Sequence, residues 1–157
     1  MKTWQRILVV VVLLLIGAVV GLVKLGQTQR DNMRSVSNLK MIGLAWSMYA
    51  DDYNDKLPDL SDAQSMKNAL ARYLNNNTAQ AERAFVQPNT GRPYQPNSSL
   101  TYKERRGFNA PSNVAVVYED APAKDGTRGV LFGDCHVDRV NETRWQALKK
   151  TSNIPGA

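Results

Sequence analysis

Seventeen consecutive residues near the N-terminus, from Ile7 to Val23, carry no charge and consist only of Val, Leu, Ile, Gly and Ala. As a helix this run spans roughly 26 Å, slightly less than the ~30 Å hydrocarbon layer of a bilayer. Trp4 and Lys24 extend the fit by interfacial anchoring and snorkelling. A body of about a hundred residues is too small to surround an all-apolar helix, so we predict a membrane-spanning helix over residues 7–23.

The sequence after this run decides between a cleaved signal peptide and a retained anchor. It reads KLGQTQ and lacks the small-x-small pattern of a cleavage site. We therefore predict an uncleaved, single-pass anchor and four segments. They are a short N-terminus (1–6), the transmembrane helix (7–23), its continuation outside the membrane (24–53) and a small globular head (54–157).

The excess positive charge lies around the apolar run and not on the head. The chain has 20 Lys and Arg against 14 Asp and Glu, and from Asp51 onward the counts are 14 and 13. A head that binds nucleic acid would carry a basic patch, so we expect no nucleic-acid partner. We interpret the flanking charge as contact with the anionic head groups of a lipid bilayer. Because basic residues flank the run on both sides, the distribution of charge does not decide which end of the helix faces the cytoplasm.

An apolar stripe continues beyond the membrane segment. Its residues recur at spacings of three and four, which is typical of one helix face: Met33, Val36, Leu39, Ile42, Trp46, Tyr49 and Tyr53. No Pro occurs before Pro58, so we predict one long helix that ends near Asp52. The stripe has to be covered either by the head of the same chain or by neighbouring subunits, and both interpretations stay open.

The remaining sequence predicts short helices and strands. A helix is expected over residues 62–74 with Ser61 as its N-cap, and a last helix begins after Asn141 and ends near Lys150. Residues 86–113 are rich in Pro, Asn, Ser and Gly and predict an irregular loop with one short strand. Three β-branched or apolar runs predict further strands: residues 114–119, 129–132 and 136–140. The last two are expected to form a tight hairpin.

Two blocks of sequence resemble a bacterial family. Residues 37–58 contain SNLKMIGLA and MYADDYNDKLP, and residues 130–137 read VLFGDCHV. Together with the apolar N-terminus, they make the chain similar, over nearly its whole length, to type IV pilins and type II secretion pseudopilins. The branch with a prepilin-type processing-associated domain is the most similar. The resemblance implies an α+β fold in which a long N-terminal transmembrane helix packs on a small antiparallel sheet with short helices.

The resemblance also implies a place in the cell. It predicts a protein of the cytoplasmic membrane, with residues 1–6 in the cytoplasm and the head on the extracytoplasmic side. The partners that it implies are other pilin-like subunits or secretion-system proteins, which would pack through the apolar helices. The expected function is that of a non-enzymatic subunit or accessory of a type II secretion or type IV pilus-like assembly.

Two positions depart from the family pattern. Pilins are cut by a prepilin peptidase after a Gly, which leaves Phe first and Glu fifth, but residues 1–6 read MKTWQR. Cys135 stands where relatives have the Gly of an Asp-Gly-His turn, a position that favours positive φ. Processing and filament assembly therefore stay open. The alternative function is a non-assembling, membrane-tethered binding module of pilin ancestry.

Candidate ligand sites are few. Asp134, His136 and Asp138 alternate and would share one face of a regular strand, where they form a candidate metal site. The simpler interpretation is that Asp134 forms the turn and His136 pairs across the strands. Two acidic groups could bind Ca²⁺, which prefers several oxygen ligands, or could simply form solvated turns. The first group is Asp51, Asp52 and Asp55, and the second is Glu119, Asp120 and Asp125. We expect no cofactor. Cys135 and His136 would point to opposite faces of a strand, so we expect no thiol enzyme.

Overall fold

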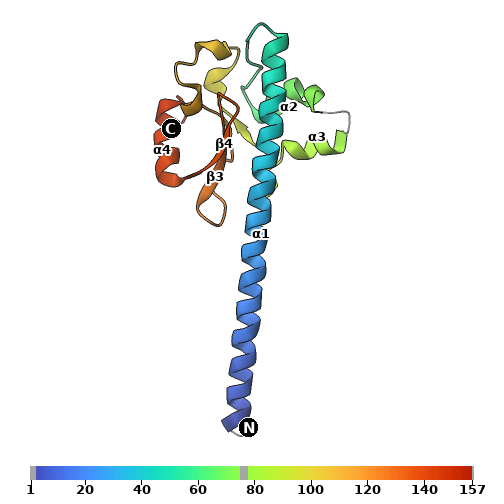
Figure 1. The fold of residues 1–157 in the computed structure, drawn as a ribbon, viewed down its shortest axis with the longest axis vertical. Coiled ribbons are helices and arrows are strands. Elements are labelled where there is room, and N and C mark those ends of the chain that lie inside the picture. Colours follow the sequence, from blue (N-terminus) through green and yellow to red (C-terminus); the bar gives the residue numbers. More distant parts are fainter. Residues whose placement is uncertain (1–2, 75–77, 157) are drawn as a thin grey trace.

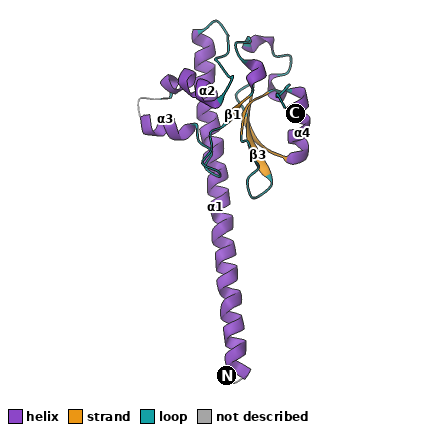
Figure 2. Ribbon diagram, turned by 180° about the vertical axis from the view of Figure 1, so that it is seen from behind, coloured by secondary structure: helices purple, strands orange, loops and turns teal. Residues whose placement is uncertain are grey.

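The computed structural model describes residues 3–74 and 78–156, and one long helix dominates it (Figure 1). Helix α1 (Thr3–Asp52) contains 50 residues, so it is about 75 Å long. Its N-terminal half stands clear of the rest of the chain, and its C-terminal half runs through the head, as the view from behind also shows (Figure 2). The predicted α+β fold, with a long apolar N-terminal helix and a small antiparallel sheet, is confirmed.

The sheet is a four-stranded antiparallel meander in the order β1-β2-β3-β4. Its strands are β1 (Gln95–Pro96), β2 (Ala115–Tyr118), β3 (Thr127–Phe132) and β4 (Val137–Asn141). The pairing of β2 with β3 is irregular between Ala115 and Val117, which is the mark of a β-bulge. Because of it, Val116 and Val117 both join the core that α1 covers.

Two short helices lie beside α1, on the side away from β3 and β4 in the view of Figure 1, and the first of them also contacts β1. Helix α2 (Ala63–Leu70) continues into a 3₁₀ turn, and α3 (Thr78–Ala84) follows. The prediction that Ser61 is the N-cap of α2 is wrong. The Asp62 carboxylate takes that role and accepts hydrogen bonds from the N–H groups of Gln64 and Ser65, both at 2.8 Å. Sequence reasoning did not predict α3.

The last helix, α4 (Glu142–Thr151), covers the other face of the sheet. Asn141 caps it as predicted, since its side-chain oxygen accepts a hydrogen bond from the Arg144 N–H at 2.9 Å. The long polar loop contains β1 and three 3₁₀ turns, which are η2 (Ser98–Leu100), η3 (Arg105–Gly107) and η4 (Pro111–Asn113). The short strand expected in that loop is therefore present.

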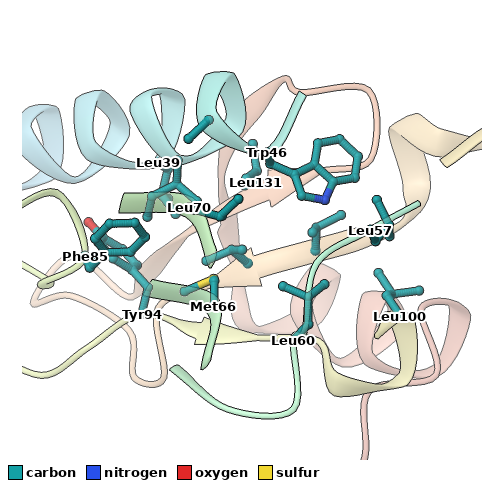
Figure 3. Close-up of a cluster of buried hydrophobic side chains, with 14 residues drawn as sticks. Leu39, Trp46, Leu57, Leu60, Met66, Leu70, Phe85, Tyr94, Leu100 and Leu131 are labelled. Carbon is teal, nitrogen blue, oxygen red and sulfur yellow. The ribbon is translucent and has the colours of Figure 1, made fainter. Parts of the chain in front are cut away.

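Two apolar cores hold the head together. The larger one joins α1, α2 and the sheet, with Leu39 and Trp46 from α1 facing Leu131 from β3 (Figure 3). The smaller one joins the sheet to α4 and contains Phe132 and Trp145. Successive residues of β3 thus point to opposite faces of the sheet, and both faces are covered by helices.

Candidate functional site: the two halves of helix α1

The N-terminal half of α1 is apolar and almost fully exposed. Leu14 is 69% exposed and Leu22 is 70% exposed. The helix is long and apolar enough to cross a membrane, and none of its most apolar window is buried in the head. Apolar surface of this extent is normally covered, by lipid or by another protein.

The C-terminal half of α1 buries one face in the head. Leu39, Ile42 and Trp46 have no exposed surface. Helix and sheet approach closely at two glycines. A Cβ at Gly43 would lie 2.8 Å from Cδ1 of Leu131, and a Cβ at Gly129 would lie 2.8 Å from Cδ1 of Leu39. The face is therefore fitted to the sheet of its own chain.

The ends of the predicted stripe are less buried than its centre. Val36 is half-buried and lines a groove of about 330 Å³ together with Met33, which is 65% exposed. Tyr49 is half-buried and stacks on Tyr53, with 4.3 Å between the ring centroids. Tyr53 itself is 42% exposed. The head of the same chain thus covers the centre of the stripe and leaves part of both ends accessible.

Polar residues that the stripe did not include complete the buried face. Ser35 is fully buried, and its hydroxyl donates to Oε1 of Glu119 at 2.5 Å. The other carboxylate oxygen of Glu119 accepts from the Gly129 N–H at 2.7 Å and lies 3.4 Å from Nη1 of Arg139. The Tyr94 hydroxyl donates to Ser35 Oγ at 2.9 Å, and burial raises the pKa of Tyr94. This network joins α1 to β3, to β4 and to the residues next to β1 and β2.

Ion pairs fix the far end of α1. The Arg105 guanidinium lies 2.8 Å from Asp51 and 2.6 Å from Asp55, and it donates to Ser47 Oγ at 3.1 Å. Arg106 adds a contact of 2.6 Å with Asp55. Partial burial acts to raise the pKa of Asp55, but the two guanidinium groups outweigh it, so the net shift is downward. These acids hold the 3₁₀ turn η3 against the helix.

An aromatic cluster adds a second clasp at the same end. The Arg72 guanidinium donates to the hydroxyls of Tyr53 at 2.7 Å and Tyr73 at 2.9 Å, and it lies over both rings. The Tyr73 hydroxyl donates to Asp52 Oδ2 at 2.8 Å. Asp51, Asp52 and Asp55, the first candidate Ca²⁺ group, are thus all engaged by cations or a phenol of the same chain.

No protein-family model, no curated protein and no solved structure matches the chain. An inference about function therefore rests on the contacts, burial and charge of α1.

The candidate metal ligands of the hairpin do not converge. Asp134 and His136 lie in the turn before β4, with Oδ1 and Nδ1 2.5 Å apart, and the His136 ring stacks on Phe132. Asp138 instead pairs with Arg144 at 2.5 Å. Within residues 3–74 and 78–156, no three His, Cys, Asp or Glu residues are grouped as metal ligands. Partial burial acts to raise the pKa of Asp134, but the hydrogen bonds with His136 outweigh it and lower the pKa.

The second acidic group is also dispersed. Glu119 is buried under α1, Asp120 pairs with Arg92 at 2.8 Å, and Asp125 accepts a hydrogen bond from the Asn32 amide at 2.7 Å. Each carboxylate thus has a partner of the same chain, and Arg139 lies near both Glu119 and Asp125. Two of the three stabilise the contact between α1 and the sheet, as Asn32 and Ser35 belong to α1.

Cys135 adopts the positive φ that the turn requires. Its φ is 68°, in the left-handed region that glycine occupies more easily. The thiol is half-buried, 3.6 Å from the Gly43 carbonyl oxygen, and burial raises its pKa. A raised pKa favours the protonated thiol, which is less reactive than the thiolate. The strained backbone conformation of Cys135 lies at a point where the hairpin contacts α1.

Proposed function

We propose that this protein is a non-enzymatic, membrane-anchored, pilin-like subunit or accessory of a type II secretion or type IV pilus-like assembly, and that it acts by helix packing. One observation carries the proposal: a single helix is bare and apolar along its first half and fitted into its own head along the second. In this proposal the helix has a structural role and takes no part in a reaction. It places a folded head at a fixed distance from a bilayer or from a bundle of like helices.

The proposed location is the cytoplasmic membrane, with the N-terminus inside and the head on the extracytoplasmic side. Residues 7–23 would cross the bilayer. Lys24 then lies at the outer head-group layer, where its side chain extends to the polar surface. Asn32, which bonds to Asp125, marks the lower edge of the head. It lies nine residues after Val23, a rise of about 14 Å, so the head stands close above the lipid.

The proposed partner surface is the outer face of α1. Leu44 is 61% exposed and Met48 is 42% exposed, and they are separated by one helical turn. Met33 lies on the same side of the helix by its spacing, with the exposed Ser37 and Lys40 between it and Leu44. A neighbouring pilin-like helix that packs on this face would bury the side chains of Leu44 and Met48, which the head leaves open.

Site-specific photo-crosslinking in native membranes tests this function. A benzoylphenylalanine at Leu44 is expected to crosslink to a second copy or to another pilin-like or secretion-system subunit. The same residue at Lys150, which is exposed on α4, serves as the matched control and should give none. If Leu44 yields only monomer in membranes that contain the assembly, the proposal is wrong.

The alternative function is a non-assembling, membrane-tethered binding module. It is favoured by the sequence MKTWQR before the apolar run, which lacks the Gly, Phe and Glu of the prepilin peptidase site. Intact-mass measurement of the protein purified from membranes distinguishes the two. Loss of the first few residues would support processing and assembly, whereas an intact Met1 together with no crosslinks would favour the tethered module.

A further inference from the structure

A pocket of about 470 Å³ lies where the long loop meets the C-terminal end of α4. The turns η2 and η4, the residues after η3 and the end of α4 form its walls. These segments lie toward the end of the head that is farther from the N-terminus of α1 (Figure 1). The pocket is thus separate from the helix packing described above, and its volume is in the range of small-ligand sites.

The floor of the pocket rests on a buried hydrogen-bond network that joins Ser99 and Ser152, which line the pocket, to Asn97 beneath them. Asn97 is fully buried, and its amide donates to the carbonyl oxygens of Ala115 at 3.0 Å and Ser152 at 2.8 Å. The Asn97 side-chain oxygen accepts from the Ser99 hydroxyl at 2.8 Å. The Ser152 hydroxyl accepts from the Ala115 N–H at 2.8 Å. A floor fixed in this way loses little entropy when a ligand binds.

The walls present polar groups that are free to bind. Lys103, Asn109, Asn113 and Asn153 line the pocket and are exposed, and within the described residues their side chains make none of the hydrogen bonds or ion pairs of the structure. Each Asn offers two donors and an acceptor, and the ammonium offers three donors and a positive charge. No carboxylate is among the described residues that line the pocket.

An aromatic ring completes the lining. Phe108 is half-buried and packs on Gly133, where a Cβ would lie 2.9 Å from its Cδ2. The ring therefore rests against backbone and has a fixed position. An apolar ring beside several amides suits a ligand with a flat C–H face and alternating hydroxyl groups at its edge.

We propose that this pocket binds an acidic oligosaccharide. Hydroxyl groups, which donate and accept, match the three amides, the sugar face matches Phe108, and a sugar carboxylate matches Lys103. A nucleic acid is a poor match, because the head carries nearly equal numbers of cations and acids. The binding chemistry does not depend on assembly. Only the source of the glycan, the cell envelope, rests on the proposed extracytoplasmic position.

Isothermal titration calorimetry of the full-length protein in detergent micelles tests the proposal. The probes are a hexasaccharide of a uronic acid, neutral cellohexaose and hexaglutamate. We expect the uronic hexasaccharide to bind most tightly. Lys103→Glu should weaken it about tenfold or more, the usual effect of losing a charge-assisted contact. Lys150→Glu makes the same charge change outside the pocket and should alter binding less than twofold.

A second variant separates shape from charge. Asn109→Ala with Asn113→Ala should weaken both hexasaccharides by a similar factor, with thermal unfolding unchanged because both side chains are exposed. The proposal is overturned if no hexasaccharide binds at millimolar concentration, if hexaglutamate binds as tightly as the uronic sugar, or if Lys150→Glu acts like Lys103→Glu. A negative result in the binding experiment would not change the crosslinking expected at Leu44, so each proposal can be contradicted independently of the other.

Discussion

Helix α1 is one continuous element in two different environments. Between Val11 and Leu25 its large apolar side chains are exposed, whereas between Ser35 and Ala50 one face has no exposed surface. The glycines show the same contrast. A Cβ at Gly17 or Gly21 would meet nothing within 4 Å, but a Cβ at Gly43 would meet Leu131 at 2.8 Å. One face of the second half is covered within this chain, whereas the first half needs a solvent or a partner over its whole surface that the chain does not supply.

The largest expected effect follows from placing charge in the first half. Leu14→Arg with Leu15→Arg should abolish membrane retention, because two arginines near the centre of a span cost about 6 kcal/mol in insertion free energy. Carbonate extraction of cell membranes measures the result. The same pair of arginines at Leu44 and Met48, which are exposed on the second half, should leave extraction unchanged. Retention of the Leu14/Leu15 variant would show that residues 7–23 are not the anchor.

The next effect is confined to the second half. Trp46→Ala removes a fully buried ring and should lower the free energy of unfolding of the head by about 3–5 kcal/mol. Leu22→Ala, at a position that is 70% exposed, should change it by less than about 0.5 kcal/mol. Urea unfolding of the full-length protein in micelles measures both. Equal losses for the two variants would mean that the head also depends on the first half.

Trp46→Phe sharpens the same comparison. The indole Nε1 of Trp46 is buried and has no hydrogen-bond partner among the described residues, so removing it relieves an unsatisfied donor. This change should cost clearly less than Trp46→Ala in the same urea measurement, about 1 kcal/mol or less. A cost as large as that of Trp46→Ala would indicate that the indole N–H has a partner, such as ordered water.

The close contact at Gly129 should give a smaller effect than Trp46→Ala. Gly129→Ala places a Cβ 2.8 Å from Leu39 Cδ1 and 3.2 Å from Ser35 Oγ. The Leu39 methyl can move, so we expect a loss of about 1–3 kcal/mol in unfolding free energy. Gly107→Ala is the matched control, since a Cβ there meets nothing within 4 Å. If both changes are neutral, helix and sheet are packed less tightly than the distances indicate.

The sequence predicts the apolar part of this site better than the polar part. Spacing alone identifies Leu39, Ile42 and Trp46, because a helix face repeats every three or four residues. It does not identify Ser35 or Asn32, whose burial depends on partners 84 and 93 residues away, at Glu119 and Asp125. A polar residue is buried only where a partner exists, and a partner so distant in the chain leaves no local pattern.

The same reasoning explains the other differences. Among the side chains of α3 whose burial the structure describes, the buried ones are the small Ala81 and Ala84, so this helix shows no strong apolar period. The hairpin residues Asp134 and Asp138 share a face only on a regular strand, and β4 begins at Val137, after the turn. The turn that includes Cys135 therefore removes the alternation on which the candidate metal site depended.

The smallest expected effect is the pH dependence at the far end of α1. The pKa of Asp55 is lowered in the folded head, so the folded state binds this proton less readily than the unfolded chain does. Its stabilising contribution is complete above the unfolded pKa of about 4 and is lost as the pH falls through the lower folded value. Asp55→Asn should therefore flatten the dependence of the melting temperature on pH below about 4. Membrane extraction of wild type and variant should remain identical across that range, because Asp55 lies at the opposite end of α1 from the apolar segment. An unchanged slope in Asp55→Asn would mean that Arg105 holds the helix through Asp51 and Ser47 alone.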